Sequence, residues 1–244
     1  MSAVIIIPAR LQSTRLPGKL LAELGGVTLI ERTFAQAKKS RLAGRVIVAT
    51  DSDEIAGLFG ADAVMTRSDH GSGTERLAEA AEKIDAEIIV NIQGDEPEID
   101  PAHIDALIET QKRAGVFAST LACPFPETLD PANPSAVKAV LGRKIAGAND
   151  CYEALYFTRA LAPYPRDGDE AEFYLHVGAY AYSKAALLKF ASAREGRNER
   201  IEKLEQLRIL EMGEKIAIRL VDIAARGIDT AADLQAARAR LAGK

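Results

Sequence analysis

Short apolar runs rich in β-branched residues recur along the first half of the chain, separated by longer segments. They occupy residues 4–7, 46–49, 88–92 and 116–121. Within each run the apolar positions are nearly continuous rather than alternating with polar ones. This pattern is typical of strands that are buried on both faces, as in a parallel sheet covered by helices.

The segments between these runs have helical patterns. In residues 27–39, apolar side chains recur at the i, i+3, i+4, i+7 spacing of one helical face. A second helix begins with the capping-box pattern of Ser72 and Glu75 and continues to about residue 84. Pro101 favours the first turn of a third helix. The alternation predicts a Rossmann-like, three-layer α/β/α fold with a mostly parallel central sheet.

The chain after residue 122 is less regular and is punctuated by prolines. Strands are expected at 152–158, 177–182 and 216–221, and helices at 199–212 and from residue 230. No internal repeat or linker is present in the sequence. We therefore expect a single domain over 1–244, in which 1–122 is followed by a smaller mixed α/β portion at 123–215, and 216–244 return to the main sheet.

Composition narrows the class of protein. The apolar content of 48% and charged content of 27% are ordinary for a folded domain, and the net charge of -4 disfavours a nucleic-acid binder. The two cysteines, Cys123 and Cys151, form no Cys-x-x-Cys pair, so neither a disulfide framework nor a thiolate zinc site is expected. The N-terminal apolar run is too short to span a membrane, which favours a cytoplasmic protein with no membrane partner.

The segment 8–19, which follows the first expected strand, carries three cations: Arg10, Arg15 and Lys19. Ligands of open α/β sheets bind outside the carboxyl ends of strands, and arginine and lysine both bind phosphate. Neither a P-loop nor a G-x-G-x-x-G fingerprint is present. An exposed basic loop would have the same composition, but the position after the strand favours a polyphosphate site.

A second candidate site follows the strand at 88–92, where Gly94 precedes Asp95 and Glu96. Magnesium prefers one or two carboxylates together with substrate phosphates. A simple β-turn would also explain this segment. Ser72, Gly73 and Arg76 offer a helix start that could bind a base edge or phosphate, although helix capping alone explains Ser72 equally well.

Signals in the second half are weaker when each is taken alone. His176 and Tyr180 share one face of an expected strand, where a histidine is more often a core residue than a ligand. Three polar residues of the helix at 199–212 share a face that is expected to be solvated: Glu202, Glu205 and Gln206. Asp229 could belong to a turn that caps the last helix.

In their order and spacing these segments resemble the 3-deoxy-manno-octulosonate cytidylyltransferase (CMP-Kdo synthetase) family. The similarity extends over nearly the whole chain. Its most specific parts are the segments His-Gly-Ser-Gly-Thr-Glu-Arg, Gln-Gly-Asp-Glu-Pro and Leu-Glu-Gln-Leu-Arg. The similar segments are 6–10, 15–19, 47–51, 65–67, 69–70, 72–76, 90–97, 133–134, 136–138, 155–157, 159–160, 204–208 and 227–230.

The resemblance implies a nucleotide-diphospho-sugar transferase type of fold. It also implies transfer of CMP from CTP to Kdo, which gives CMP-Kdo and pyrophosphate and activates Kdo for lipopolysaccharide synthesis. It implies Mg²⁺ on Asp95 and Asp229, a homodimer, and a second portion that binds the sugar and dimerises. Catalysis would fall to Lys19, Asp95, Asp229 and Arg15. The implied nucleotide-binding residues are Pro8, Ala9, Arg10, Arg15, Lys19, Ser72, Gly73 and Arg76. The implied sugar-binding residues are Gln93, His176, Tyr180, Glu205 and Gln206, with Glu202 left on the solvated face.

Two alternatives stay open at this point. The acceptor could be another keto sugar acid, such as 8-amino-Kdo or a sialic acid. The chain could also be a nucleotide-binding module that regulates a partner without catalysis, although a pure binder would not need both Asp95 and Asp229. No residue of the sequence requires the role of general base.

Overall fold

The chain forms two compact units. The first comprises Met1–Asp105 and Ala225–Lys244, and the second comprises Ala106–Ala224. The computed structural model describes residues 2–11, 16–147, 150–168, 171–224 and 227–242. Helix α4 (Pro101–Ala114) contains the first boundary between the units in the sequence.

Four parallel strands form the sheet of the first unit, in the order β3-β2-β1-β4. They are β1 (Ala3–Ala9), β2 (Arg45–Thr50), β3 (Ala63–Met65) and β4 (Ile88–Asn91). The centre of β1 is fully buried at Ile5, Ile6 and Ile7. The apolar runs at 4–7, 46–49 and 88–92 thus form buried parallel strands, which confirms the expectation for this half.

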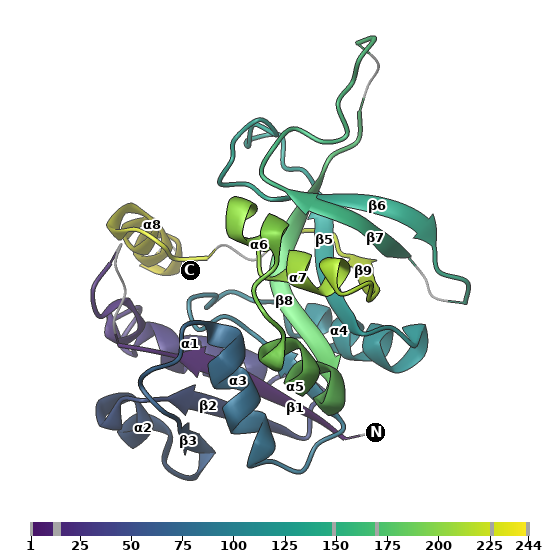
Figure 1. Ribbon diagram of the computed structural model, residues 1–244. Helices are drawn as coiled ribbons and strands as arrows, with labels where there is room; N and C mark the ends of the chain where they lie inside the picture. Colours follow the sequence, from purple (N-terminus) through teal and green to yellow (C-terminus); the bar gives the residue numbers. More distant parts are fainter. Residues whose placement is uncertain (1, 12–15, 148–149, 169–170, 225–226, 243–244) are drawn as a thin grey trace. The chain divides into compact units, whose positions relative to one another are not determined.

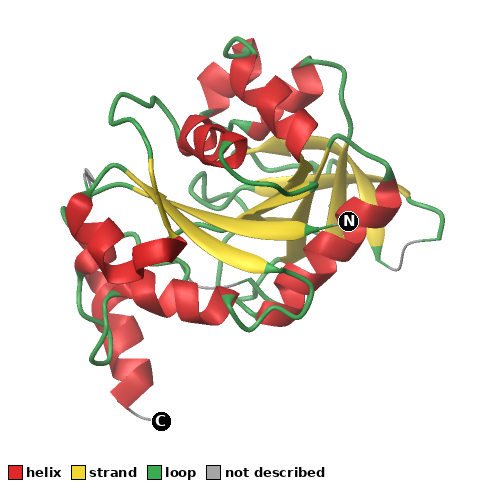
Figure 2. Ribbon diagram, turned by 90° about the horizontal axis from the view of Figure 1, so that it is seen from below, coloured by secondary structure: helices red, strands yellow, loops and turns green. Residues whose placement is uncertain are grey.

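The helices of the first unit connect these strands. The chain moves outward from β1 to β3 through α1 (Leu29–Ala37) and α2 (Asp53–Phe59), then returns to β4 through α3 (Gly73–Glu82). Right-handed crossovers therefore place α3 on the face opposite α1 and α2. Figure 1 shows α3 in front of β1 and β2, and Figure 2 shows red helices to either side of the yellow strands. Helix α8 (Ala231–Ala242) completes the unit.

Several short elements were not predicted from the sequence. These are β3, α2 and two 3-10 turns, η1 (Lys19–Leu21) and η2 (Gly60–Asp62). Each has too few residues to establish a period. The capping box expected at Ser72 forms only in part. The Ser72 hydroxyl accepts from the amide of Glu75, but the Glu75 carboxylate accepts from the amide of Gly71.

The second unit has five strands in the order β8-β5-β9-β7-β6. Among its described strands, β5 and β9 pair in parallel and the other pairs are antiparallel, so this sheet is mixed, as the fold class predicted for the smaller portion. The β6–β7 hairpin stands out at the upper right of Figure 1. The strands are β5 (Ala118–Pro124), β6 (Lys138–Lys144), β7 (Cys151–Thr158), β8 (Tyr174–Ser183) and β9 (Ile216–Leu220).

The single helix expected at 199–212 is wrong. The chain forms α6 (Arg197–Glu202) and α7 (Gln206–Glu211), after α5 (Lys184–Ser192). Lys203 ends α6 in the left-handed conformation, with φ of 53°. The Arg159 guanidinium donates to the carbonyls of Glu202 and Lys203 at 2.6 and 3.4 Å, and these bonds stabilise the break.

The break also removes Glu202 from the solvated face on which the sequence placed it. Its carboxylate accepts from the Thr158 hydroxyl at 2.7 Å and from the Arg159 amide at 2.8 Å. Glu202 is therefore a structural anchor for the end of β7.

Across the described parts of the chain, none of the helices is both long and apolar enough to span a bilayer.

Candidate active site

The charged centre of the first unit is formed by Lys19, Asp95 and Asp229. The Lys19 Nζ lies 2.5 Å from Asp95 Oδ2 and 3.1 Å from Asp229 Oδ1. It also donates to the Ile228 carbonyl at 3.2 Å. Two carboxylates 134 positions apart in the numbering, 95 and 229, thus hold a single cation. Charge-assisted bonds of this kind are the stronger hydrogen bonds of proteins.

The backbone explains why these segments meet. The Ile228 amide donates to the Asp95 carbonyl at 2.9 Å, which fixes the segment before α8 against the segment after β4. Gly94 lies close to the end of β1, since a Cβ there would be 3.3 Å from Leu20 Cδ2, a tight contact, and 3.5 Å from the Pro8 carbonyl oxygen. The Thr33 hydroxyl of α1 donates to the Gly94 carbonyl at 2.9 Å. The Asp95 loop therefore lies against the end of β1 and the side of α1.

Helix α8 begins immediately after Asp229 with its own reciprocal cap. The Asp233 carboxylate accepts from the Thr230 amide and hydroxyl at 2.8 and 2.7 Å, and the Thr230 hydroxyl accepts from the Asp233 amide. These bonds, led by that of the Thr230 hydroxyl, lower the pKa of Asp233. Because Asp233 and Thr230 supply the cap, the Asp229 carboxylate can serve the cluster with Lys19. The sequence allowed Asp229 to belong to a turn that caps the last helix. That explanation fits Thr230 and Asp233, but the Asp229 side chain bonds Lys19 instead.

Asp95 and Asp229 suit a magnesium ion. Magnesium takes one or two protein carboxylates and completes its shell with water and phosphate oxygens. The ammonium of Lys19 already occupies a position within reach of both carboxylates, as a cation would. Within the described residues, no group of three or more His, Cys, Asp or Glu side chains is arranged to hold a metal ion. A magnesium ion at this place would have the two carboxylates as its protein ligands.

The end of β1 holds two of the expected nucleotide-binding residues. Pro8 and Ala9 end β1, where they are paired with Ala49 and Thr50 of β2. Arg10 follows and is exposed to solvent. Arg15 lies outside the described residues, so its predicted place in the polyphosphate site is not tested by the structure.

The start of α3 approaches the end of β1 as well. A Cβ on Gly73 would lie 3.8 Å from Pro8 Cγ, so the first turn of the helix reaches the end of β1. Arg76 is only 4% exposed, and it donates to Thr66 Oγ1 at 2.5 Å and to Asp51 Oδ2 at 3.0 Å. It therefore links α3 to the segments after β2 and β3. Its contact with a nucleotide stays a prediction, as do those of Ser72 and Gly73.

Glu96 adds a feature that the sequence did not distinguish from Asp95. Its Oε2 is buried and has no hydrogen-bond partner in the described part of the chain. Burial, and then the negative charge of Asp95, raises the pKa of Glu96 to about 8. Its carboxyl group is therefore mostly protonated at neutral pH. The sequence shows two adjacent acids after a strand. Burial distinguishes the protonated Glu96 from Asp95, which contacts Lys19.

In the second unit, His176 and Tyr180 belong to an aromatic row along β8. The His176 ring lies 4.9 Å from that of Phe157 and 5.5 Å from that of Tyr180, and Tyr180 stacks on Tyr182 at 5.9 Å. Burial lowers the pKa of His176 to about 3 and raises that of Tyr180 well above its usual value. Both side chains are therefore neutral hydrogen-bonding groups that retain partial exposure.

Glu205 and Gln206 follow the break at Lys203. Glu205 is the N-cap residue of α7, and Gln206 is its first residue. Gln206 is 6% exposed, and its Nε2 is buried without a hydrogen-bond partner among the residues that the structure describes. An amide without a partner costs about 1–3 kcal/mol, so such groups call for an explanation. A ligand hydroxyl would supply the missing acceptor.

A buried ion pair holds α7 in place. Arg208 forms two bonds with the Glu199 carboxylate of α6, at 2.7 and 2.5 Å, and donates to the Ala193 carbonyl at 3.2 Å. Its guanidinium also lies 4.9 Å from the Phe190 ring centroid. The helix that presents Gln206 is thus fixed to both α5 and α6.

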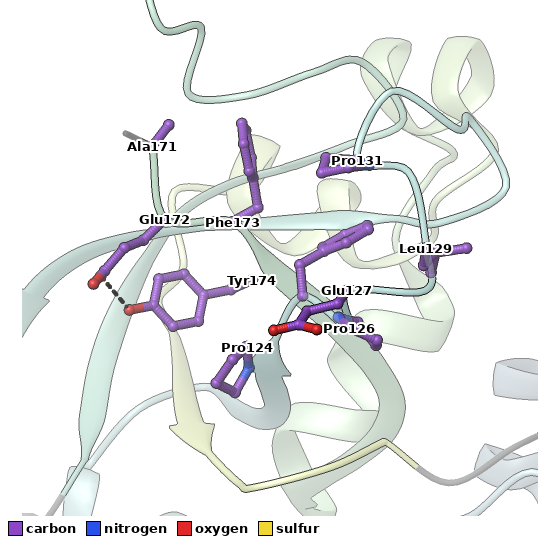
Figure 3. A pocket seen from close by; sticks show the side chains of 10 residues that line it. Pro124, Pro126, Glu127, Leu129, Pro131, Ala171, Glu172, Phe173 and Tyr174 are labelled. Carbon is purple, nitrogen blue, oxygen red and sulfur yellow. Dashed lines mark hydrogen bonds between the residues drawn. The ribbon is translucent and has the colours of Figure 1, made fainter. Parts of the chain in front are cut away.

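The expected residues therefore fall into two groups. Gln93, which was expected to bind the sugar, lies in the first unit two positions before Asp95, whereas His176, Tyr180, Glu205 and Gln206 lie in the second. A pocket of about 440 Å³ in the second unit is lined by none of them. Figure 3 shows its proline and aromatic lining, with Tyr174 donating to Glu172.

Similarity to known proteins extends over the same chain. The Cytidylyltransferase family model matches residues 4–216. A 3-deoxy-manno-octulosonate cytidylyltransferase of Chelativorans sp. (strain BNC1) is 43% identical, over 100% of this chain and 98% of that protein. The enzyme of the same name from Chloroherpeton thalassium is 44% identical, over 100% of this chain and 99% of its own length.

The fold agrees with a solved structure of CMP:2-keto-3-deoxy-manno-octonic acid synthetase complexed with CTP. The two chains have a TM-score of 0.91 and 37% identity, over 100% of this chain and 99% of the other. The nucleotide-diphospho-sugar transferase type of fold is thereby confirmed. With sequence and fold similar over the full length, the chain belongs to the 3-deoxy-manno-octulosonate cytidylyltransferase family.

Proposed function

We propose that this protein transfers CMP from CTP to the anomeric hydroxyl of Kdo and releases pyrophosphate. The observation that carries the proposal is the pair Asp95 and Asp229, held on one cation in a chain of this family. A nucleotide-binding module without catalysis would need no such pair. The reaction joins two anionic substrates, so neutralisation of charge and positioning should dominate catalysis.

Asp95 and Asp229 would hold Mg²⁺. When bound, the ion would neutralise phosphate charge and lower the pKa of the attacking hydroxyl. Lys19, Arg10 and Arg15 would bind the triphosphate and stabilise the departing pyrophosphate, since each supplies a permanent positive charge. Ser72, Gly73 and Arg76, with the backbone at Pro8 and Ala9, would bind cytosine and ribose.

The second unit supplies neutral groups that suit the hydroxyl-rich acceptor. His176 and Tyr180 remain uncharged at neutral pH, and the Nε2 of Gln206 lacks an acceptor among the described residues. Glu205 and Gln93 would add further hydrogen bonds to the sugar acid. Neutral donors and acceptors discriminate strongly between hydroxyl patterns, because an unmatched buried polar group is costly.

Pyrophosphate release tests the proposal directly. We would incubate the purified protein with magnesium, one of CTP, ATP, GTP and UTP, and a panel of Kdo, 8-amino-Kdo and sialic acid. Release with CTP and Kdo alone supports the proposed reaction. A preference for 8-amino-Kdo or sialic acid would correct the acceptor, and no release with any pair would favour the non-catalytic module.

We further propose a homodimer formed through the second unit. Its support is a set of exposed apolar side chains there: Leu155 is 63% exposed, Tyr164 75% and Ile201 67%. Sedimentation velocity of wild type and Leu155→Asp tests this, with Leu58→Asp in the first unit as the matched control. A wild-type monomer, or a dimer unaffected by Leu155→Asp, would contradict an interface at this strand.

The same proposal places the reaction in the cytoplasm, as a supplier of CMP-Kdo for lipopolysaccharide synthesis. Cys123 and Cys151 are buried free thiols, which suits a reducing compartment. Fractionation of cells that express the protein, followed by detection with an antibody, would check the location. Recovery with the periplasmic fraction would contradict it.

A further inference from the structure

Thr120 of β5 lies beneath His176 and is completely buried. Its hydroxyl oxygen is 3.0 Å from His176 Nε2, 2.8 Å from the Ala179 carbonyl oxygen and 3.3 Å from the Val177 carbonyl oxygen. Three polar atoms thus surround a single hydroxyl. Two of them, the carbonyl oxygens, can only accept a hydrogen bond.

A bulge in the strand pairing creates this arrangement. Thr120 is paired with Tyr180, but the next residue, Leu121, is paired with Val177. Two residues of β8, at 178 and 179, are therefore left over opposite one step of β5. The bulge brings the carbonyls of Val177 and Ala179 to the same hydroxyl, and it leaves His176 and Tyr180 with their rings 5.5 Å apart.

The single proton of the Thr120 hydroxyl then determines the tautomer of His176. A hydroxyl has one proton, and its closest acceptor is the Ala179 carbonyl at 2.8 Å. With that proton donated to the carbonyl, the Thr120 oxygen can only accept from His176. The neutral imidazole must then carry its hydrogen on Nε2, which leaves a lone pair on Nδ1.

We propose that Thr120 is a positioning residue that holds His176 in the Nε2–H tautomer, so that Nδ1 accepts a hydrogen bond from a hydroxyl of the sugar acid. The part that concerns the sugar rests on the proposed function, whereas the tautomer does not. The Phe157 and Tyr180 rings, with centroids 4.9 and 5.5 Å from that of the imidazole, restrict its rotation.

The first measurement is the tautomer in the ligand-free protein. The chain has 3 histidines, so a ¹⁵N spectrum of labelled imidazoles can be assigned by comparison with His176→Asn. We expect a protonated Nε2 and an unprotonated Nδ1 for His176 in the wild type and in Thr120→Ser. In Thr120→Val, the pattern should shift toward a mixture. A protonated Nδ1 in the wild type would overturn the proposal.

The second measurement is the split between the two substrates. Thr120→Val should raise the KM for Kdo by about five- to tenfold, because one hydrogen bond loses its acceptor. The KM for CTP should change by less than about twofold, and Thr120→Ser should restore the wild-type values. Thr110→Val is the matched control, since Thr110 is also buried and bonds a carbonyl of its own helix.

The outcomes separate the two claims. A wild-type protein with the Nε2–H tautomer but no turnover of any sugar acid would reject the proposed function and leave the tautomer intact. Active enzyme in which Thr120→Val changes neither the spectrum nor the KM for Kdo would reject the role of Thr120. If Thr120→Val fails to fold, Thr120→Ala provides the same comparison with a smaller side chain, and the wild-type spectrum still decides the tautomer.

Discussion

The first unit gathers ionised side chains at its candidate site, whereas the second unit presents side chains that are held neutral. In the first, Lys19 lies between Asp95 and Asp229, with Arg10 exposed nearby in the sequence. In the second, burial keeps His176 uncharged by lowering its pKa to about 3, and it raises the pKa of Tyr180. The two units are thus built for different ligand chemistry.

This difference follows from what each substrate requires. A triphosphate carries several negative charges, which must be neutralised by cations for another anion to approach. A sugar acid is distinguished by the pattern of its hydroxyls, for which fixed neutral donors and acceptors are better suited than mobile charges. Variants of the first unit should therefore affect the nucleotide and the metal, and variants of the second unit should affect the sugar.

The largest effect is expected from Asp95→Asn. Loss of one carboxylate from the pair should lower kcat by about a thousandfold, the upper range for removing one electrostatic contact of a transition state. Turnover as a function of magnesium concentration, with the fold checked by circular dichroism, measures this. Asp100→Asn is the matched control, because the Asp100 carboxylate accepts from the Ala102 amide, and asparagine caps equally well. Near-normal turnover of Asp95→Asn would remove Asp95 from the metal site.

Lys19→Ala should have the next largest effect, with kcat/KM for CTP lowered by about a hundredfold. Without its ammonium, Asp95 and Asp229 repel each other, so the ligand-free variant should also melt at a lower temperature. Magnesium should therefore raise the melting temperature of the variant more than that of the wild type. Lys39→Ala, an exposed lysine of the same unit, is the control. Unchanged CTP kinetics would exclude Lys19 from the triphosphate site.

Tyr180→Phe should produce a smaller effect that is confined to the sugar. Loss of one neutral hydrogen bond should raise the KM for Kdo by about tenfold or less and leave the KM for CTP nearly unchanged. Tyr164→Phe, at a tyrosine that is 75% exposed, should change neither value. A larger increase in the KM for CTP than for Kdo would reverse the assignment of the two units.

The local sequence pattern predicted the parallel strands β1, β2 and β4 of the first unit, because continuous apolar runs and helix-start residues are themselves signals of structure. The position of Asp95 was predictable for the same reason, since it lies in the short segment that follows β4. The short elements β3 and α2 were not, because three or seven residues define no reliable period.

Features that depend on distant partners could not be predicted. The helix break at Lys203 is stabilised by Arg159, 44 positions away in the sequence. Thr120 looks like any strand residue, and its place beneath His176 depends on the bulge in the partner strand. Glu96 and Asp95 are adjacent acids, and only burial of one carboxyl oxygen separates them.

The smallest effect concerns the pH dependence of stability, to which the two units contribute with opposite sign. The pKa of His176 falls from 6.5 to about 3 on burial, so between these values the unfolded chain binds more protons and the free energy of unfolding rises with pH. The pKa of Glu96 rises from 4.5 to about 8, chiefly through burial, so there the folded chain binds more protons and the free energy of unfolding falls as pH rises.

From about pH 5 to about pH 6.5 these slopes overlap and oppose each other, each being at most about 1.4 kcal/mol per pH unit. Urea unfolding in EDTA should therefore show little pH dependence for the wild type. In Glu96→Gln only the contribution of His176 remains, so the free energy of unfolding should rise with pH. In His176→Asn only the contribution of Glu96 remains, so the free energy of unfolding should fall as pH rises. If both variants stay as flat as the wild type, His176 is not held neutral by the fold and Glu96 is not held protonated, and the second unit loses one of the neutral groups that distinguish it from the ionised cluster of the first.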